Sequence, residues 1–421
     1  MAVCFWGKDI KKNYRCTYSI TEDGMSIEVE YDIEEEIPLQ NGMRVVGSYN
    51  YPQRDIYVVD SKEHKYYLVK NACYAGNSNR YAGIDSKFIT TFQSHIFFEH
   101  GNSDKLMEIP ENPKCSAIRV FSNDLIRMVG LLSYKQTDSD GELTIRLNKK
   151  AEPIDLDITT DKIKGIIYND DWRQNSNLNT GEFSIDITPY IEIRFKRRQY
   201  YEDLFRYIFE LELYMQLYSK GGFKVDKVWA KINDSFYGFN CGVRKFDYKG
   251  NKRTSVDDSL VSFLKVCYSK IDYACTTKTW LRNISYAVGP KARNIEDNFL
   301  LFYKFIECFY KSKNEKGIAN RFIMKSIEEH DVSRKHTDEE LLNLSREIVC
   351  LRNHYVHSGY FIKNGSLKIS KPRDDDEKYK SFTPYTAVAD VEWIYSKTEL
   401  LNNITIDIIY KDILDYKSFR R

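Results

Sequence analysis

The hydrophobic pattern of the chain changes its period at about residue 197, and this change constrains the fold more than any other feature. Before it, apolar and polar residues alternate, as in 26–31 and 142–147. Turn signals such as Asp23-Gly24 separate these segments, and short alternating segments with such punctuation are typical of antiparallel strands. Residues 1–196 are therefore predicted to form an antiparallel β-sandwich-like domain, with a barrel as the other architecture that fits.

The end of this β-rich region is predicted to be a pair of strands within 183–195, arranged around Pro189. Beyond it, apolar residues recur three or four positions apart, which predicts a helix over 197–220 that ends at Gly221-Gly222. A strand-like piece over 224–232 and a helix that begins near Ser255 follow. Residues 197–289 are accordingly interpreted as a mixed connecting region.

From residue 290 to the end the pattern is mainly helical, so residues 290–421 are predicted to form an all-α bundle and the fold class is α+β. Helices are expected over 297–311, 320–329, 337–357 and 390–416, with a loop or small hairpin over 362–383. The helix over 337–357 has a clear N-terminal signal, because Thr337 is followed by three acidic residues, which favour a helix N-terminus. Gly359 predicts its end.

The charge of the chain excludes a protein that coats nucleic acid. The 421 residues include 63 basic and 61 acidic side chains, a net charge of +2, whereas such proteins carry a strong basic surplus. Any contact with RNA is therefore expected at a small local site. The 9 cysteines form no Cys-x-x-Cys pair, which indicates reduced, buried thiols rather than a zinc site or a disulfide framework. No signal peptide and no membrane span is recognised, so a cytoplasmic protein is expected.

One short segment, 348–360, combines residue types that suit phosphodiester chemistry. Asn353 and His357 are four positions apart and share a helix face, and Arg352 is long enough to reach the same face. In RNA the ribose 2′-OH can attack the adjacent phosphate if a base removes its proton and an acid protonates the leaving 5′-oxygen. Histidine can do either near neutral pH, and an arginine can stabilise the phosphate. Neither a metal ion nor another cofactor is needed, because the nucleophile belongs to the substrate.

This Arg-Asn-x-x-x-His string, on a late helix and followed by a glycine, resembles the Arg-x(4–6)-His signature of HEPN domains. The layout of the chain is similar to that of the ApeA-like HEPN family of bacterial anti-phage proteins, which place a β-rich ApeA domain before a HEPN domain. Segment 299–310 resembles the early HEPN helix of that family, which often carries a glutamate where this chain has Glu307. Segment 184–232 resembles the end of the family's N-terminal region.

The resemblance implies that Arg352, Asn353 and His357 are the catalytic set of a metal-independent endoribonuclease. It further implies a homodimer, formed through the HEPN domain, in which two motifs face each other. It also implies a role in abortive infection, in which a phage-derived trigger releases cleavage of host RNA, often tRNA. The N-terminal domain would sense this trigger or restrain the nuclease.

Other interpretations of the same residues remain open. The HEPN domain could be a non-catalytic module that only dimerises or binds nucleic acid, and the motif could arise by chance. Glu307 either pairs with Arg352 and orients it or is an ordinary surface residue. His354, three positions before His357, is expected at the edge of the site.

Overall fold

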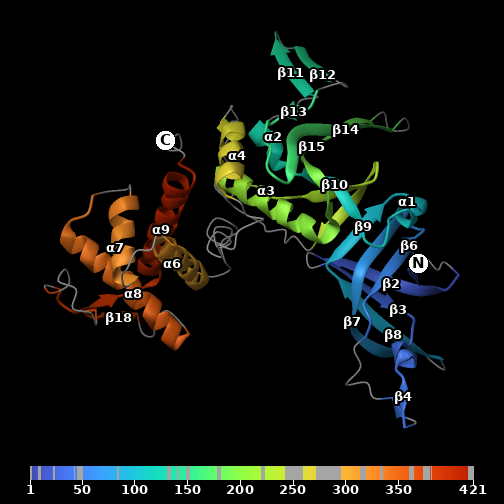
Figure 1. The fold of residues 1–421 in the computed structure, drawn as a ribbon, viewed down its shortest axis with the longest axis horizontal. Coiled ribbons are helices and arrows are strands. Elements are labelled where there is room, and N and C mark those ends of the chain that lie inside the picture. The colour runs from blue at the N-terminus through green and yellow to red at the C-terminus, as the bar shows by residue number, and fades with distance from the viewer. Residues whose placement is uncertain are drawn as a thin grey trace. The chain divides into compact units, whose positions relative to one another are not determined.

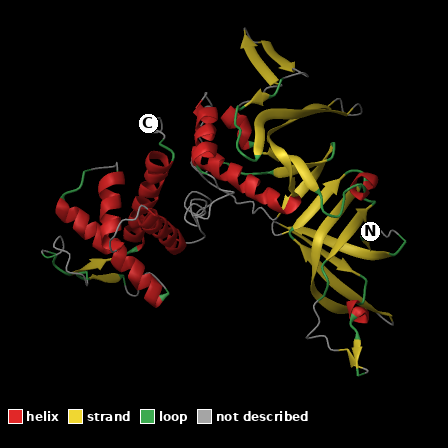
Figure 2. Cartoon of the chain, in the orientation of Figure 1, coloured by secondary structure: helices red, strands yellow, loops and turns green. Residues whose placement is uncertain are grey.

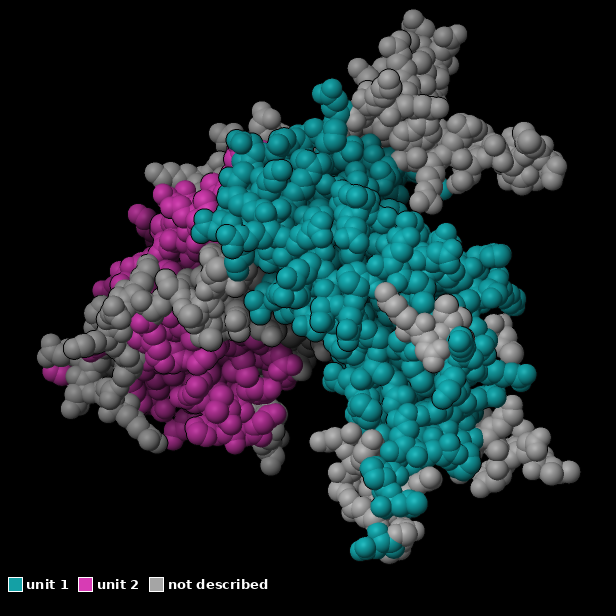
Figure 3. Space-filling model, turned by 45° about the vertical axis from the view of Figure 1, so that its right-hand side comes forward, with its two compact units in different colours: residues 1–212, 223–247, 254–257 teal, residues 213–222, 248–253, 258–421 magenta. Residues whose placement is uncertain are grey.

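The computed structural model describes residues 2–7, 11–21, 24–41, 43–44, 51–82, 85–129, 134–139, 142–147, 152–177, 182–219, 223–241, 259–271, 295–312, 319–331, 335–359, 365–372, 380 and 382–415. The chain divides into two compact units, coloured separately in Figure 3. The first comprises residues 1–212, 223–247 and 254–257, and the second comprises residues 213–222, 248–253 and 258–421. Strands β1 to β17 lie in the first unit, and helices α6 to α9 lie in the second. Figure 2 distinguishes the strands, in yellow, from the helices, in red.

The first unit is built from antiparallel strands with short helices between them (Figure 1). Its strands are β1 (Ala2–Trp6), β2 (Asn13–Thr21), β3 (Gly24–Val29), β4 (Leu39–Gln40), β5 (Met43–Arg44), β6 (Arg54–Asp60), β7 (Lys65–Ala82), β8 (Asp85–Ser94), β9 (Ile96–His100), β10 (Lys114–Phe121), β11 (Tyr134–Ser139), β12 (Glu142–Leu147), β13 (Ile154–Asp155), β14 (Ile163–Asn177), β15 (Glu182–Tyr200), β16 (Lys227–Ile232) and β17 (Ser235–Cys241). Its helical segments are η1 (Ile33–Glu36), α1 (Ser103–Met107), α2 (Asp124–Val129), η3 (Tyr201–Asp203) and α3 (Leu204–Ser219), whose last turns belong to the second unit.

Among the described residues, 13 of these strands form one sheet in the order β13-β14-β15-β10-β16-β17-β9-β7-β6-β1-β2-β3-β8. Strand β7 pairs with β9 along its first part and with β8 along its second. Because β8 also pairs with β3, the strands β7, β6, β1, β2, β3 and β8 close into a barrel-like ring. The expected sandwich-like arrangement is therefore replaced by one continuous sheet with a closed part. The sheet also extends past residue 196, since β16 and β17 join it.

The closed part of the sheet surrounds an apolar core. Strand β3 alternates, so that Met25, Ile27 and Val29 are buried, and Ile56 and Val58 of β6 join the same cluster. This alternation is the period that predicted strands from the sequence. Burying each such side chain contributes roughly 1.5–3 kcal/mol. The ring is therefore stabilised by its apolar core as well as by the hydrogen bonds between its strands.

The segment around residue 200 differs from the prediction. Strand β15 continues through Pro189 to Tyr200, and α3 begins only at Leu204. The extension is stabilised by pairing, because Gln199 and Tyr200 lie opposite Cys115 and Lys114 of β10. Pro189 is tolerated because the pairing of β15 with β10 ends at Tyr190, next to it. The helical spacing of apolar residues in the sequence therefore begins at residue 197, seven residues before the first residue of α3.

The second unit is mainly helical. It contains α4 (Ser259–Lys270), α6 (Ile295–Ser312), α7 (Ala319–His330), α8 (Asp338–Ser358), α9 (Val391–Ile408) with a final π-helical turn η5 (Ile409–Ile413), and a hairpin of β18 (Ser366–Ile369) and β19 (Tyr385–Val388). Helix α7 packs against α6, α8 and α9, and the hairpin packs against α8. The helices expected over 297–311, 320–329, 337–357 and the first part of 390–416 are confirmed. The predicted loop or small hairpin of 362–383 contains β18, but its partner β19 lies beyond the predicted bounds. The helix start near Ser255 and the charged run 373–377 lie outside the described residues.

None of the helices in the described ranges is both long enough and apolar enough to cross a membrane.

Candidate active site

Helix α8 carries the predicted motif, and both of its ends are fixed by capping groups. At the N-terminus the Thr337 hydroxyl accepts a hydrogen bond from the backbone N–H of Glu340 at 3.3 Å, and Glu340 Oε2 accepts one from the backbone N–H of Thr337 at 2.9 Å. This is a capping box. At the other end Gly359 adopts a left-handed φ of 72° and donates its N–H to the carbonyl of Tyr355 at 2.8 Å. The helix therefore ends directly after the motif.

Two charged side chains on α8 fix which face of the helix is buried. Arg346, 4% exposed, donates from Nη1 to Asn320 Oδ1 of α7 at 2.8 Å and from Nε to the carbonyl of Ser370 at 2.8 Å. Glu347 accepts a hydrogen bond from the Tyr385 hydroxyl at 2.7 Å and forms an ion pair with Lys397 at 2.5 Å. Charge-assisted contacts of this kind are stronger than neutral ones. They fix the rotation of this part of α8 about its axis. Asn353 and His357 lie seven and eleven positions after Arg346, on the same helix face, but are exposed near the end of the helix.

Arg352, Asn353 and His357 lie near the C-terminal end of α8, and the structure records a contact between the first two. Arg352 is half-buried, whereas Asn353 and His357 are exposed. The Arg352 guanidinium donates from Nη1 to Asn353 Oδ1 at 3.0 Å, so its side chain turns toward the face that Asn353 and His357 share. Within the described part of the chain the His357 imidazole forms no hydrogen bond and no ion pair, so both of its nitrogens are available to a ligand.

A groove of about 530 Å³ lies beside the motif, between α6 and α8. It is lined by Asp297, Leu300, Leu301, Tyr303, Lys304, Glu307, Arg352 and Val356. The Arg352 guanidinium lies over the Tyr303 ring, with Cζ 5.7 Å from the ring centroid, a cation–π geometry. Arg352 therefore belongs both to the wall of the groove and to the exposed face of the motif.

Glu307 lines the same groove but is not bonded to Arg352. Its carboxylate accepts a hydrogen bond from Lys311 at 2.7 Å and lies 3.6 Å from Lys304 Nζ. Burial alone would raise the pKa of Glu307, but the Lys311 bond and the charges of Lys304, Lys311 and Arg352 outweigh it and lower that pKa. Glu307 is therefore an anion near neutral pH and acts on Arg352 only through space.

The second histidine of the motif, His354, is half-buried and does not line the groove. It therefore differs from Asn353 and His357, which are both exposed. Among the residues that the structure describes, no group of three or more His, Cys, Asp or Glu side chains is arranged to hold a metal ion.

The sequence did not identify Tyr303 or Val356 as parts of the site. Tyr303 is 3% exposed and its ring supports Arg352, while Val356 is 52% exposed at the edge of the groove. A signal for Tyr303 existed, because it lies four residues before Glu307 on one face of α6. Val356 likewise lies four residues after Arg352 on one face of α8. Neither spacing alone reveals that α6 and α8 lie across a groove from each other.

No protein-family model matches the chain. The comparisons with curated proteins and with solved structures find no match either.

Proposed function

We propose that the second unit is a metal-independent endoribonuclease of the HEPN type. The observation that carries the proposal is the arrangement at the end of α8. There the guanidinium of Arg352 is held by Asn353 and Tyr303, and His357 is exposed one turn further along, on the helix face of Asn353. An exposed imidazole beside a positioned guanidinium supplies the two functions that cleavage of an RNA phosphodiester requires, proton transfer and stabilisation of the phosphorane charge.

In the proposed reaction the ribose 2′-oxygen attacks phosphorus and the bond from phosphorus to the 5′-oxygen breaks. A base removes the 2′-OH proton, and an acid donates a proton to the leaving 5′-oxygen. Arg352 stabilises the negative charge on the phosphate oxygens, and Asn353 positions Arg352 through the 3.0 Å hydrogen bond. The products carry a 2′,3′-cyclic phosphate and a 5′-hydroxyl.

One copy of the chain offers one exposed imidazole in this motif, whereas the reaction uses a base and an acid at once. A homodimer that places two copies of α8 face to face supplies both from His357 of each copy. The exposed Val356 and the half-buried Leu300 and Leu301 provide an apolar surface next to the motif, which supports such an association.

The biological role proposed with this activity is anti-phage defence by abortive infection. RNA, with tRNA as the first substrate to test, would be cut after a phage-derived trigger is sensed. This part of the proposal rests on the resemblance of the Arg352-to-His357 motif and of the chain layout to the ApeA-like HEPN family.

A second candidate is a non-catalytic module that binds nucleic acid or another copy of the chain. The apolar character of the groove favours it, because Leu300, Leu301 and Val356 suit a protein contact better than a phosphate. The exposure of His357 favours the enzyme instead.

Cleavage of total tRNA by the purified full-length chain in EDTA, with analysis of the product ends, tests the proposal. Wild type, Arg352→Ala and His357→Ala are compared, with His354→Ala as the matched histidine control. Cyclic phosphate ends that disappear in the first two variants and persist in the control are expected. An absence of cleavage by wild type, with and without phage lysate, would support the binding module.

A further inference from the structure

Strand β15 of the first unit leaves its regular pairing with β10 over residues 195–198. On β10 only Ser116 lies between the residues that pair with Arg194 and Gln199, so four residues of β15 face one residue of β10. Bulges bend a strand and redirect its side chains out of the regular pleat. The redirected segment includes three consecutive basic residues, 196–198.

The bulge is held in place by hydrogen bonds on both of its sides. Gln199 donates from Nε2 to the backbone carbonyl of Arg197 at 2.7 Å, and its Oε1 accepts a hydrogen bond from the Tyr207 hydroxyl of α3 at 3.2 Å. Toward β14, the backbone N–H of Lys196 donates to the carbonyl of Lys162 at 2.8 Å. The bulge is therefore a built part of the fold.

Five basic side chains gather at this bulge. Three lie on the bulge itself, and two lie at the start of β14, which the backbone bond from Lys196 to Lys162 brings alongside. Lys162 is half-buried and the other four are exposed. None of the five forms an ion pair with a carboxylate within the described ranges. We call these residues the basic array: Lys162, Lys164, Lys196, Arg197 and Arg198.

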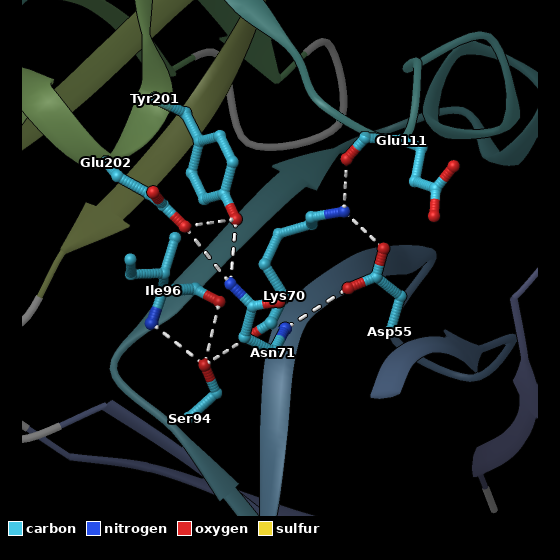
Figure 4. Close-up of polar contacts among 8 residues, drawn as sticks. All are labelled: Asp55, Lys70, Asn71, Ser94, Ile96, Glu111, Tyr201 and Glu202. Carbon is cyan, nitrogen blue, oxygen red and sulfur yellow. Dashed lines mark hydrogen bonds and ion pairs between the residues drawn. The ribbon is translucent and has the colours of Figure 1, made fainter. Parts of the chain in front are cut away.

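Lys70, another cation of the first unit, shows how such a charge is neutralised elsewhere. It is 2% exposed and is paired with Asp55, as Figure 4 shows. The same figure shows Glu202, the first acidic residue after the bulge, which accepts hydrogen bonds from Asn71 Nδ2 at 3.3 Å and from the Tyr201 hydroxyl at 3.1 Å. Neither Asp55 nor Glu202 is recorded in contact with the basic array.

The basic array is a local excess of positive charge in a chain whose charge is almost balanced. Segments 161–164 and 194–198 contain six basic residues and one acidic residue, Asp161, whereas the whole chain has a net charge of +2. Like charges at short range repel one another. A polyanion that binds along the array removes this repulsion, and clustered Lys and Arg side chains are the footprint of nucleic-acid binding.

The surroundings of the basic array favour a nucleic-acid strand over a membrane surface. Tyr200, which follows the bulge, is 48% exposed, and Lys114 Nζ of β10 lies 4.4 Å from its ring centroid. Single strands bind where bases stack on aromatic rings and phosphates contact cations. An anionic membrane would instead require exposed apolar side chains along the array. The apolar residues between its members, Ile163 and Phe195, are buried.

We propose that the basic array is a docking surface for the phosphate backbone of single-stranded RNA, with Tyr200 stacking a base at its end. The choice of RNA rests on the nuclease proposed for the second unit. The docking surface lies entirely in the first unit and supplies no group to the cleavage reaction.

Binding of a labelled single-stranded RNA to the full-length chain, followed by fluorescence anisotropy at several salt concentrations, tests the proposal. Every ribose of the probe carries a 2′-O-methyl group, so that binding is measured without cleavage. The test variant removes three charges of the array together: Lys196→Gln, Arg197→Gln and Arg198→Gln. The control variant removes three exposed charges elsewhere in the first unit: Arg15→Gln, Lys62→Gln and Lys65→Gln.

The test variant is expected to bind the RNA at least about tenfold more weakly than wild type. The slope of log affinity against log salt concentration should fall by about 2, because each phosphate contact to a single strand contributes about 0.7. The control variant, and a variant with Arg197→Lys and Arg198→Lys that keeps the charge, should bind within about twofold of wild type.

Equal affinity of the test and control variants would overturn the proposal, as would tighter binding of phosphatidylserine vesicles or of polyglutamate than of the RNA. The two proposals fail separately. Array-dependent binding by a chain that cleaves no unmodified RNA would refute the nuclease and keep the docking surface. Cleavage of unmodified RNA together with unchanged binding by the test variant would refute the docking surface alone.

Discussion

The guanidinium of Arg352 donates a hydrogen bond to the side-chain oxygen of Asn353 at 3.0 Å while it lies over the ring of Tyr303. Two adjacent residues on a helix point in directions about 100° apart, so this bond turns the Arg352 head group toward the face that Asn353 and His357 share while Arg352 still lines the groove. The relationship makes Asn353 a positioning residue for Arg352 and leads to the following predictions.

Arg352→Lys is expected to lower kcat/KM for RNA cleavage by about a hundredfold, the loss typical of removing one donor to a developing oxyanion. Lysine keeps the charge but cannot offer the planar fork that contacts two phosphate oxygens at once. Arg321→Lys, on the exposed side of α7, is the control and should cleave like wild type. Equal activity of Arg352→Lys and wild type would show that only the charge matters.

Asn353→Ala and Asn353→Asp are expected to reduce cleavage in a fixed order. Alanine removes the acceptor that positions Arg352, which should cost about tenfold in kcat/KM through lost orientation. Aspartate keeps an acceptor but adds a negative charge that opposes the phosphate, so a larger loss is expected. Steady-state kinetics on one RNA substrate measure the order. An aspartate variant more active than the alanine variant would contradict the role assigned to Asn353.

Glu307→Gln is expected to change RNA cleavage by less than about threefold, because Glu307 is bonded to Lys311 and not to Arg352. The stability effect depends on pH. The folded-state pKa of Glu307 is lowered, so its contribution is present above the ordinary glutamate range and is lost as the pH falls through the folded-state pKa.

Chemical denaturation at neutral and at acidic pH measures that effect. We expect a destabilisation below about 1 kcal/mol at neutral pH, since Glu307 is only partly buried and its partners are exposed lysines. The difference between variant and wild type should vanish in acid. A loss of cleavage as large as that of Arg352→Lys would instead make Glu307 a partner of Arg352.

Glu212→Gln is expected to stabilise the chain at alkaline pH. Glu212 of α3 is 8% exposed, and burial raises its pKa from 4.5 to about 7 despite a hydrogen bond from the backbone of Val225. Because the unfolded state loses this proton first, stability falls as the pH rises from about 4.5 to about 7 and then stays low. Glutamine keeps the acceptor for Val225 and removes the charge.

The expected gain is about 1–3 kcal/mol above pH 7 and nothing below pH 4, measured by denaturant unfolding at both pH values. A gain of equal size at both pH values would mean that packing, and not the buried charge, limits stability at this position.

Local patterns explain which parts of the fold could be predicted. The acidic residues after Thr337 and the stop at Gly359 are short-range signals, and they predicted the bounds of α8 within about a residue at each end. The structure shows a capping box and a left-handed Gly359 at these two ends. The start of α3 could not be found in this way, because pairing of Gln199 and Tyr200 with β10 overrides a helical pattern that is already present in the sequence.

Long-range contacts explain what the sequence did not reveal. Closure of the ring requires β8 to pair with both β3 and β7. Short-range sequence patterns predict strands but do not specify which strands pair with each other. The same holds for the site: the residue types of the motif were visible, but the support of Arg352 by Tyr303 depends on how α6 and α8 lie. The pairing of Glu307 with Lys311 was available from their spacing.

In the proposed reaction the attacking group belongs to the RNA, and His357 transfers its proton. The most direct measurement compares wild-type cleavage of an RNA with that of the same RNA carrying 2′-O-methyl groups at the mapped cleavage sites, both in EDTA. We expect cyclic phosphate ends from the unmodified RNA, complete resistance of the methylated RNA, and no cleavage of either RNA by His357→Ala. Cleavage of the methylated RNA at the same sites would contradict it.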